Sequence, residues 1–458
     1  MSLFITRTDF FEYMSRPLTS WGNYPIVPAT EVLFSVPDHL PGVLTKPCIA
    51  RGNGRCYGDA SLSATVISTR KFDKILAFDG QTGIVHCQSG VLLADLLEVF
   101  VPQGWFLPVT PGTKYITVGG AVASDVHGKN HHVEGAFSNH VLEMTVHTAR
   151  GPIRCSPTEN VDLFAATCGG MGLTGIILDV CFQLKRIHTA YIRQRQVKTA
   201  NLEAVLDLFD AYADATYSVA WIDCLQTGRG FGRSILILGE HATPAEVQAI
   251  GVTEPLRLPP SKQVSVPFAL PSFVLHPLTI RAFNALYYHK NRKKIQDSIV
   301  PYERFFYPLD AVLHWNRLYG RRGFVQYQCV LPKAYGRQGL VDLLQRISQR
   351  GMGSFLAVLK LFGPQDGLIA FPMEGYTLAL DFPVRRGLLE FLDDLDRIVL
   401  AYGGRLYLSK DARMPRDVFW KSYAHSQKFL AIVQQYNPDF LFSSVQSDRL
   451  GITVEKVT

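Results

Sequence analysis

Three histidines fall within six positions in the segment SDVHGKNHH, residues 124–132: His127, His131 and His132. Imidazoles at such spacing serve as metal ligands, or as hydrogen-bonding and proton-transfer groups in a ligand pocket. A zinc site built on H-x₃-H needs both histidines on one helix face and a further ligand motif. Gly128 and Asn130 disfavour a helix here, and the chain has no H-E-x-x-H motif. The sequence therefore predicts no metal site.

Glycines gather in three clusters, each placed between apolar runs. In the first, ARGNGRCYGD (residues 50–59), the glycines let successive backbone N–H groups point into one concavity, which suits a pyrophosphate. This cluster has the spacing of neither a Walker loop nor a G-x-G-x-x-G turn, and alone it is equally typical of a plain glycine turn. The second cluster, residues 111–132, ends in the three histidines. The third, residues 160–177, predicts a helix, a glycine turn and a buried strand.

The elements around these clusters change character along the chain. Residues 30–190 are short apolar runs typical of strands, with a helix predicted at 91–100. Beyond residue 190, helical patterns alternate with strand-like runs, which predicts an α+β domain with one sheet covered by helices. The helical patterns are 201–215, 338–351 and 387–404, and the strand-like runs are 233–240, 324–332 and 376–384. The basic, aromatic stretch at about 265–300 has no clean period and is expected to be a flexible loop.

The overall composition is that of a folded protein with more than one core. The 458 residues predict two closely packed domains, and 47% hydrophobic with 19% charged residues exclude a disordered chain. The net charge of +7 suits an anionic ligand or membrane surface, but no basic stripe with interleaved aromatics indicates nucleic acid. None of the eight cysteines forms C-x₂-C, so free thiols are expected. Without a signal peptide or an apolar run of spanning length, we expect a cytoplasmic protein whose membrane contact, if present, is peripheral at the inner face of the plasma membrane.

The three clusters, in this order and spacing, resemble the FAD-binding domain of the vanillyl-alcohol-oxidase/PCMH flavoprotein superfamily. The resemblance implies that the first loop cradles the FAD pyrophosphate and that the second lies against the isoalloxazine and ribityl chain. The third would help to hold the adenine end. Many members attach the flavin covalently through a histidine of the first loop, and this chain has Arg55 at that position. Noncovalent FAD is therefore expected.

A closer resemblance, to the decaprenylphosphoryl-β-D-ribose 2′-oxidase family, extends along nearly the whole chain. It rests on the segments above together with FFYPLD (305–310), GFVQYQ (323–328), LKLFGP (359–364), LDFP (380–383) and GGRLYLSKDAR (403–413). The family oxidises the 2′-hydroxyl of a polyprenylphosphoryl-β-D-ribose to a ketone, and a partner short-chain reductase completes the epimerisation to the arabinose form. The resemblance implies an α+β, two-domain PCMH-type fold. Residues 1–190, completed by 405–458, would bind FAD, and residues 191–404 would form the substrate-binding domain, an antiparallel sheet covered by helices.

The resemblance also assigns roles to single residues. Lys410 would stabilise reduced flavin as a cation, or act as a base if burial lowered its pKa. His127 would orient the substrate or carry its proton, and His131 and His132 would be structural. The implied cofactor-binding residues are Arg51, Gly52, Asn53, Gly54, Arg55, Cys56, Tyr57, Gly58, Asp59, Gly112, Thr113, Thr117, Gly119, Gly120, Ala123, Ser124, His127, Gly128, Asn130, Gly172, Ile176 and Tyr407. The implied substrate-binding residues are Tyr57, Tyr307, Trp315, Gln326, Gln328, Lys360, Thr377 and Ala379.

Two departures from the family pattern lie in one strand. Ala379 stands where mycobacterial members have a cysteine, and Thr377 where they have an asparagine. These departures put the sugar specificity in doubt more than the reaction. The stretch 270–300 is either a dock for the polyprenyl phosphate or a solvated loop. Three rival functions remain: an FAD-dependent alditol or aldonolactone-type oxidase on a soluble sugar, an NADPH-dependent enolpyruvate reductase, and a flavin- or lipid-binding module without turnover.

Overall fold

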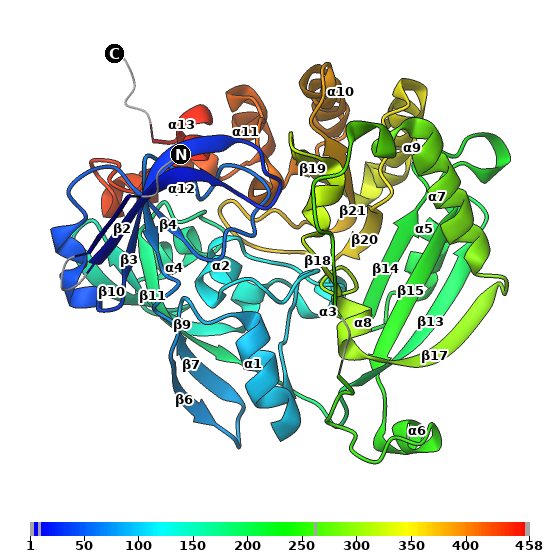
Figure 1. Cartoon of the computed structure of the whole chain (residues 1–458), viewed down its shortest axis with the longest axis horizontal. Helices are drawn as coiled ribbons and strands as arrows, with labels where there is room; N and C mark the ends of the chain where they lie inside the picture. The colour runs from blue at the N-terminus through cyan, green and yellow to red at the C-terminus, as the bar shows by residue number, and fades with distance from the viewer. Residues whose placement is uncertain (1–3, 8–10, 261–262, 454–458) are drawn as a thin grey trace.

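The computed structural model of the chain describes residues 4–7, 11–260 and 263–453 (Figure 1). Two halves lie side by side in this view. The left half holds two five-stranded sheets built from the first 190 residues, and the right half holds one eight-stranded sheet. One apolar cluster contains buried residues of both halves, among them Val109 and Leu361, so the two halves share a core.

The first sheet of the left half has the strand order β1-β2-β3-β5-β4. Neighbours among β1, β2 and β3 are antiparallel, whereas β3 and β4 both run parallel to β5. The strands are β1 (Phe4–Arg7), β2 (Phe11–Thr19), β3 (Ile26–Phe34), β4 (Ile49–Arg51) and β5 (Thr65–Ser68). Because β4 ends at Arg51, the first glycine cluster begins where this buried strand stops.

The second sheet of the left half is antiparallel, in the order β10-β9-β11-β7-β6. Its strands are β6 (Ile75–Asp79), β7 (Ile84–Gln88), β9 (Val141–Thr148), β10 (Gly151–Cys155) and β11 (Ile176–Gln183). The predicted helix near residue 95 is α1 (Leu93–Phe100), whose buried residues repeat at helical spacing. Around it lie α2 (Val118–Ala123), α3 (His131–Glu134), α4 (Val161–Thr167) and the short pair β8 (Trp105–Phe106) and β12 (Lys185–Arg186).

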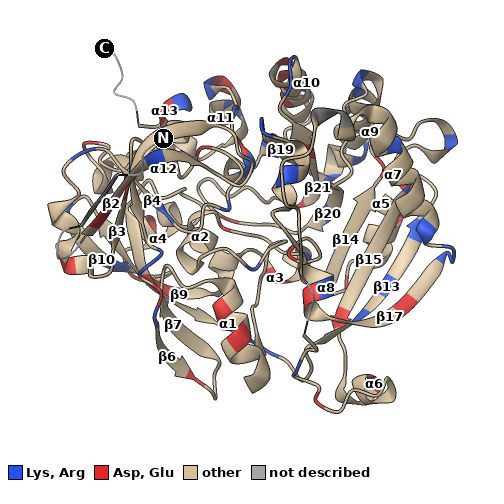
Figure 2. Ribbon diagram, viewed as in Figure 1, with Lys and Arg blue, Asp and Glu red and all other residues tan. Residues whose placement is uncertain are grey.

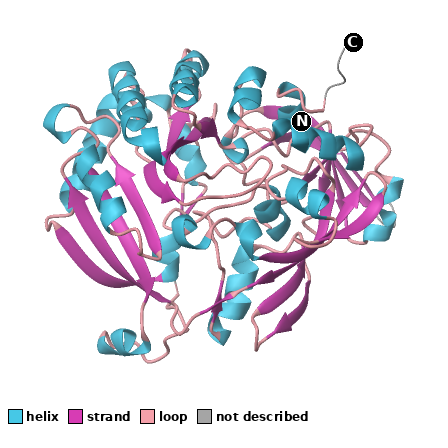
Figure 3. Cartoon of the chain, turned by 180° about the vertical axis from the view of Figure 1, so that it is seen from behind, coloured by secondary structure: helices cyan, strands magenta, loops and turns pink. Residues whose placement is uncertain are grey.

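The sheet of the right half is antiparallel throughout, in the order β17-β13-β15-β14-β20-β21-β19-β22. Its strands are β13 (Tyr191–Thr199), β14 (Tyr217–Ile222), β15 (Ser234–His241), β17 (Ile295–Pro301), β19 (Phe324–Pro332), β20 (Ala357–Phe362), β21 (Gly375–Pro383) and β22 (Arg405–Leu406). The three predicted helices are α5 (Leu202–Ala211), α9 (Lys333–Arg350) and α10 (Leu388–Ala401), which pack on this sheet (Figure 3). The predicted α+β class with a helix-covered antiparallel sheet is confirmed.

The C-terminal segment crosses back to the left half. Its helices are α11 (Arg416–Ser422), α12 (Ser426–Tyr436) and α13 (Val445–Arg449), seen in orange and red above the first sheet in Figure 1. Phe442 forms a parallel bridge with Cys48, and the Val445 amide donates to the Leu62 carbonyl at 2.8 Å. The chain end thus packs against the strand that precedes the first glycine cluster.

The segment 265–300 differs from the expected flexible loop. It holds a 3₁₀ turn (Ser272–Leu275), the helix α7 (Pro277–Lys290) and the start of β17, and α6 (Pro244–Ala249), β16 (Val264–Ser265), α8 (Tyr302–Phe306) and β18 (Val312–Leu313) flank it. The helical period was hidden because α7 carries apolar residues on both sides, buried Ile280 and exposed Leu278 and Leu286. In the part of the chain that the structure describes, no helix is both long and apolar enough to cross a membrane.

Candidate active site

All three glycine clusters meet at one cavity of about 340 Å³, whose other walls come from β19, β20, β21 and the 3₁₀ turn Leu408–Lys410. This volume lies within the range of small-molecule sites. The cavity therefore lies where the C-terminal segment and the sheet of the right half meet the left half.

The first glycine cluster forms an open nest of backbone donors. Within the described residues, none of the N–H groups of residues 52–55 donates to another part of the chain. Gly54 has a φ of 61°, a conformation that glycine adopts without strain. A Cβ added to Gly52 would lie 2.2 Å from the Thr117 hydroxyl oxygen, so the first cluster touches the second directly. Such a nest is suited to an anionic phosphate group.

The second cluster forms the floor of the cavity. Thr117 caps α2, its hydroxyl accepting from the Gly120 amide at 3.1 Å. Gly119 lets the helix approach Ser89 at the end of β7, since an added Cβ would stand 2.8 Å from the Ser89 Cβ. The Ser89 hydroxyl is buried without a described partner although its residue lines the cavity. An orphaned polar atom in a cavity wall indicates a ligand partner.

His127 lies just outside α3, in an isolated antiparallel bridge with Ala136. Its Nε2 is 3.1 Å from the Nε2 of Gln328, an amide donor, so His127 Nε2 must accept and the imidazole proton stands on Nδ1. Nδ1 is buried without a described partner. Burial, reinforced by Lys360, lowers the pKa of His127 well below its ordinary value. His127 is thus a neutral donor that faces the cavity.

Thr377 orients the Gln328 side chain that contacts His127. Its hydroxyl donates to the Cys329 carbonyl at 2.8 Å and accepts from Gln328 Nε2 at 3.3 Å. With the threonine proton committed to the carbonyl, the amide nitrogen of Gln328 must point toward Thr377 and His127. Thr377 therefore does not line the cavity, contrary to the expectation that it binds substrate, and instead sets the protonation pattern of His127.

Lys410 projects from the 3₁₀ turn onto Tyr57, with Nζ 3.8 Å from the ring centroid. Burial lowers the pKa of Lys410 to about 8, and nearby Asp381 partly offsets the effect. Lys360 on β20 also lines the cavity, and burial together with the Lys410 charge lowers its pKa to about 7. Two lysine amines thus share one cavity, and the charge of Lys410 opposes the protonation of Lys360.

Asp381 is a cavity residue that the sequence argument missed. It is 1% exposed, its Oδ1 accepts from Gln326 Nε2 at 2.6 Å and its Oδ2 from the Tyr319 hydroxyl at 3.2 Å. Burial raises the pKa of Asp381 to about 6, which the two hydrogen bonds and Lys410 limit. The signal was available, because Asp381 stands two residues after Ala379 on β21 and both line the cavity.

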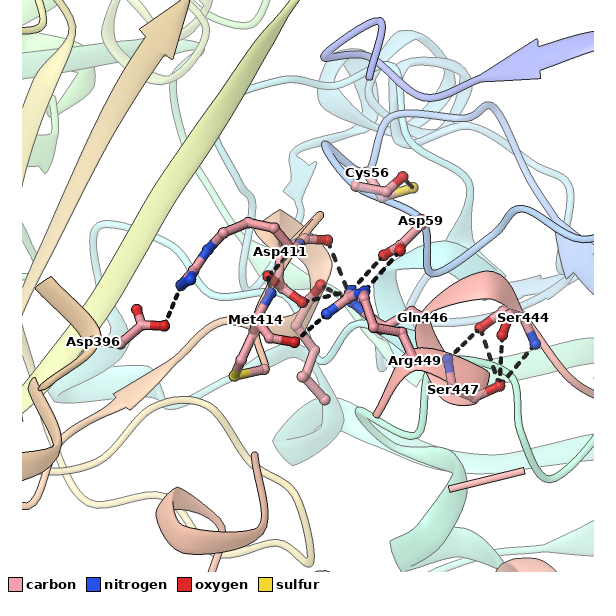
Figure 4. A network of polar contacts seen from close by, with 12 residues as sticks. Cys56, Asp59, Asp396, Asp411, Met414, Ser444, Gln446, Ser447 and Arg449 are labelled. Carbon is pink, nitrogen blue, oxygen red and sulfur yellow. Dashed lines mark hydrogen bonds and ion pairs between the residues drawn. The ribbon is translucent and has the colours of Figure 1, made fainter. Parts of the chain in front are cut away.

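Figure 4 shows a buried polar network around Asp411, the residue that follows Lys410. Arg449 on α13 bonds Asp59 and Asp411, each at 2.8 Å, and so ties the first glycine cluster to the residue after Lys410. Tyr57 donates its amide to the Ser409 carbonyl at 3.0 Å. A Cβ on Gly58 would lie 1.6 Å from the Asp411 carbonyl oxygen, so the two backbones are in direct contact.

Most of the expected site residues line the cavity. They are Arg51, Gly52, Asn53, Gly54, Arg55, Cys56, Tyr57, Gly112, Thr113, Thr117, Gly119, Gly120, Ala123, Ser124, His127, Gly172, Trp315, Gln326, Gln328, Lys360, Ala379, Tyr407 and Lys410. Further lining residues were not expected, among them Trp21, Ser89, Met171, Ile177, Asp310, Asp381 and Ser409. The Arg55 guanidinium stacks on Trp21 at 4.0 Å from the ring centroid.

Several expected residues stand behind the wall. The Tyr307 hydroxyl is 2.6 Å from that of Thr110, and Asn130 donates to the Pro108 carbonyl at 2.8 Å, and neither residue lines the cavity. Ile176 points into a separate apolar cluster, and its neighbour Ile177 lines the cavity instead, as alternation along a strand requires. The remaining residues that do not line the cavity are Gly58, Asp59, Gly128 and Thr377.

The other two histidines lie outside the cavity wall. His131 packs against Phe362 with ring centroids 4.6 Å apart, and His132 Nε2 is 2.8 Å from the Ala215 carbonyl oxygen. Because α3 begins only at His131, His127 does not share a helix with them. Across the described ranges, no three His, Cys, Asp or Glu side chains are placed to hold a metal ion together.

Comparison with known proteins agrees with this geometry. Residues 45–156 match the family model described as an FAD binding domain. The chain is 34% identical to the decaprenylphosphoryl-beta-D-ribose oxidase of Mycolicibacterium smegmatis, over 97% of this chain and 99% of the relative. It is 32% identical to an uncharacterized protein in the mprA 5' region of Streptomyces coelicolor, over 79% of this chain and all of that relative. The L-gulonolactone oxidase of Bos taurus is 30% identical over 35% of this chain and 36% of its own length.

Proposed function

The chain belongs to the decaprenylphosphoryl-β-D-ribose oxidase family, and from this premise we propose that it oxidises the 2′-hydroxyl of a polyprenylphosphoryl-β-D-ribose to the 2′-keto sugar. The reaction is the first half of an epimerisation to the arabinose form. The enzyme is an FAD-dependent oxidoreductase. The observation that carries the proposal is the convergence of His127, Lys360, Asp381 and Lys410 on the cavity that holds the glycine nest.

The residues present fit FAD. The free N–H groups of residues 52–55 suit its pyrophosphate, and the orphaned Ser89 hydroxyl offers a polar contact further along the same cavity. When bound, FAD supplies the acceptor for the hydride of the carbinol carbon. We expect noncovalent binding, because Arg55 stands at the position from which related proteins attach the flavin.

The chain's own residues handle the charge and the proton. Protonated Lys410 would provide in this cavity the positive charge that stabilises a reduced, anionic flavin. His127 donates from Nδ1 and orients the sugar. It is a poor base, because burial and the nearby lysines oppose its protonation. Asp381 is held as a carboxylate by Gln326 and Tyr319, and a pKa near 6 suits it to accept the hydroxyl proton at neutral pH.

The lipid-linked form of the substrate is the finer part of the proposal. It is supported by the relative's name and by Lys360, an amine in the cavity without an ion-pair partner among the described residues, whose charged form a phosphate would stabilise. We propose in addition that a short-chain reductase takes up the keto product, because a ketone released without reduction would not complete the epimerisation. A polyprenyl chain requires a membrane, so the enzyme is expected to work in peripheral contact with one.

Flavin bleaching tests the reaction directly. We expect that anaerobic addition of a synthetic short-chain prenylphosphoryl-ribose bleaches the visible flavin bands of the purified protein. The matched controls are the prenyl phosphate without sugar and free ribose, neither of which should bleach the bands. Bleaching by free alditols or aldonolactones, but not by the lipid-linked sugar, would instead establish the soluble-sugar oxidase. A colourless protein that FAD cannot reconstitute would contradict the whole assignment.

A further inference from the structure

We propose that the outer side of α7 and the basic turn behind it form the surface by which this enzyme docks on an anionic lipid bilayer. We call this surface the α7 face and define it by Leu278, Arg281, Leu286 and the basic residues of 290–294. The inference rests on the proposed function, since a lipid-linked substrate brings the enzyme to a membrane. It adds which surface makes the contact and which lipid charge that surface requires.

Large apolar side chains stand in water along α7. Leu278 is 68% exposed and Leu286 is 73% exposed, and their separation of eight residues places them on the same side of the helix. In the segment that leads to α7, Val264 is 66% and Phe268 64% exposed. Exposed leucines beside cations give this surface both groups that a membrane interface accommodates, apolar side chains for the acyl boundary and positive charge for the headgroups.

Exposed cations lie on α7 near Leu278 and, in larger number, at the C-terminal end of the helix beyond Leu286. Arg281, Lys290, Arg292, Lys293 and Lys294 are exposed, and none of them forms an ion pair with a described residue. The nearest acid along the chain, Asp297, is already paired with Arg195 at 2.7 Å. Figure 2 shows basic residues in blue where α7 ends beside the tips of β13 and β17. A cationic surface without acidic partners is complementary to anionic headgroups.

The α7 face is held rigidly from below. Asn284 on the buried side donates to Asp223 at 2.9 Å, and Arg233 completes that buried network at 2.8 Å. Tyr287 packs on Trp221 with ring centroids 4.7 Å apart. The leucines are therefore presented on a fixed helix, and no ordering cost of a loop opposes docking.

The α7 face also begins beside the active-site cavity. Leu275, two residues before α7, is buried in one cluster with Trp315, and Trp315 lines the cavity. Phe283 on α7 packs edge-on against Phe355, and the next residue, Leu356, lines the cavity. An apolar substrate tail that leaves the cavity along these side chains would meet the bilayer that α7 contacts.

Vesicle flotation of the FAD-loaded, full-length protein tests the proposal. The probes are phosphatidylcholine vesicles with and without phosphatidylglycerol. The charge variant changes Lys290, Arg292, Lys293 and Lys294 to Gln. Its matched control changes four exposed cations elsewhere that have no ion pair among the described residues: Lys46, Arg150, Arg386 and Lys428. The apolar variant is Leu278→Ser with Leu286→Ser, and its control is Val161→Ser with Ile250→Ser, both exposed on other elements.

We expect the wild type to float with anionic vesicles, to be released by salt and to ignore neutral ones. Loss of each cation should weaken binding about fivefold, and loss of each leucine about tenfold, while the controls bind as the wild type does. Equal melting temperature and flavin content exclude misfolding of a variant.

If the wild type floats with neither kind of vesicle, the proposal is overturned, and the α7 face would then be a candidate surface for a protein partner. The proposal is also overturned if the α7 variants bind vesicles as the wild type does. Vesicle binding needs no turnover. Docking without bleaching by the short-chain substrate would therefore contradict the proposed function alone, and bleaching without docking would contradict this inference alone.

Discussion

The pH dependence of flavin reduction tests whether Asp381 accepts the hydroxyl proton. Burial raises the pKa of Asp381 to about 6, and burial lowers the pKa of Lys410 to about 8. The reaction needs Asp381 ionised and Lys410 protonated. The rate should therefore rise as the pH increases through about 6 and fall as it increases through about 8.

Removal of one hydrogen bond should move only the acid limb of this profile. The Tyr319 hydroxyl donates to the Asp381 carboxylate at 3.2 Å. A hydrogen bond to a charged group contributes about 1.5–3 kcal/mol, and about 1.4 kcal/mol corresponds to one pKa unit. Tyr319→Phe should therefore raise the Asp381 pKa by about one to two units and leave the alkaline limb in place. The control is Tyr302→Phe, which removes a buried hydroxyl outside the cavity wall.

The assay is single-turnover stopped-flow bleaching of the flavin with excess short-chain substrate across the pH range. Asp381→Asn should lower the rate about 10²–10⁴-fold and abolish the acid limb. If Asp381→Asn kept the wild-type rate together with the same acid limb, the reasoning would be refuted. Neutral Lys410 would then be the better candidate for the base, since its lowered pKa leaves part of it unprotonated at neutral pH.

Three further predictions concern the parts that hold this site. Arg449→Met should lower the stability by about 3–5 kcal/mol, because it leaves the buried Asp59 carboxylate without its cationic partner and removes one of two cations near Asp411. Lys421→Met at an exposed pair should cost less than about 1 kcal/mol, and thermal unfolding measures both. Gly58→Ala should abolish FAD retention, measured as the flavin-to-protein absorbance ratio, whereas Gly42→Ala, whose Cβ would meet nothing within 4 Å, should not. Lys410→Gln should make the flavin midpoint potential more negative by about 30 mV or more, and a Lys410→Arg variant that failed to restore it would contradict the electrostatic role.

Much of the fold could be predicted from the sequence because its signals are local. The helices α5, α9 and α10 and the strands β15, β19 and β21 follow from hydrophobic period, and the three glycine clusters from composition. The sequence-based predictions were wrong where buried and exposed apolar residues share one helix, and where a shift of one position along a strand decides which residue lines the cavity. In α7 the exposed leucines obscured the helical period, and on β11 a shift of one position exchanged Ile176 for Ile177 in the cavity wall.

The candidate site was harder to predict where its chemistry depends on partners. Thr377 and Gln328 were both expected at the substrate, but only the structure shows that Thr377 fixes the amide of Gln328 and thereby the tautomer of His127. Asp381 was visible in the sequence as part of the LDFP segment. Its importance follows from burial beside Tyr319 and Gln326, which no spacing along the chain reveals.

The position of Lys410 shows most clearly why sequence spacing is insufficient. Lys410 reaches Tyr57 because the Gly58 and Asp411 backbones touch and Arg449 bridges Asp59 to Asp411. These contacts join the first glycine cluster to two C-terminal segments that lie hundreds of residues further along the chain. A lysine on a mobile segment would stabilise reduced flavin less, because electrostatic catalysis depends on groups that are fixed before the reaction begins. The arrangement therefore makes the C-terminal segment part of the active site, although of its residues beyond Lys410 none lines the cavity in the described structure.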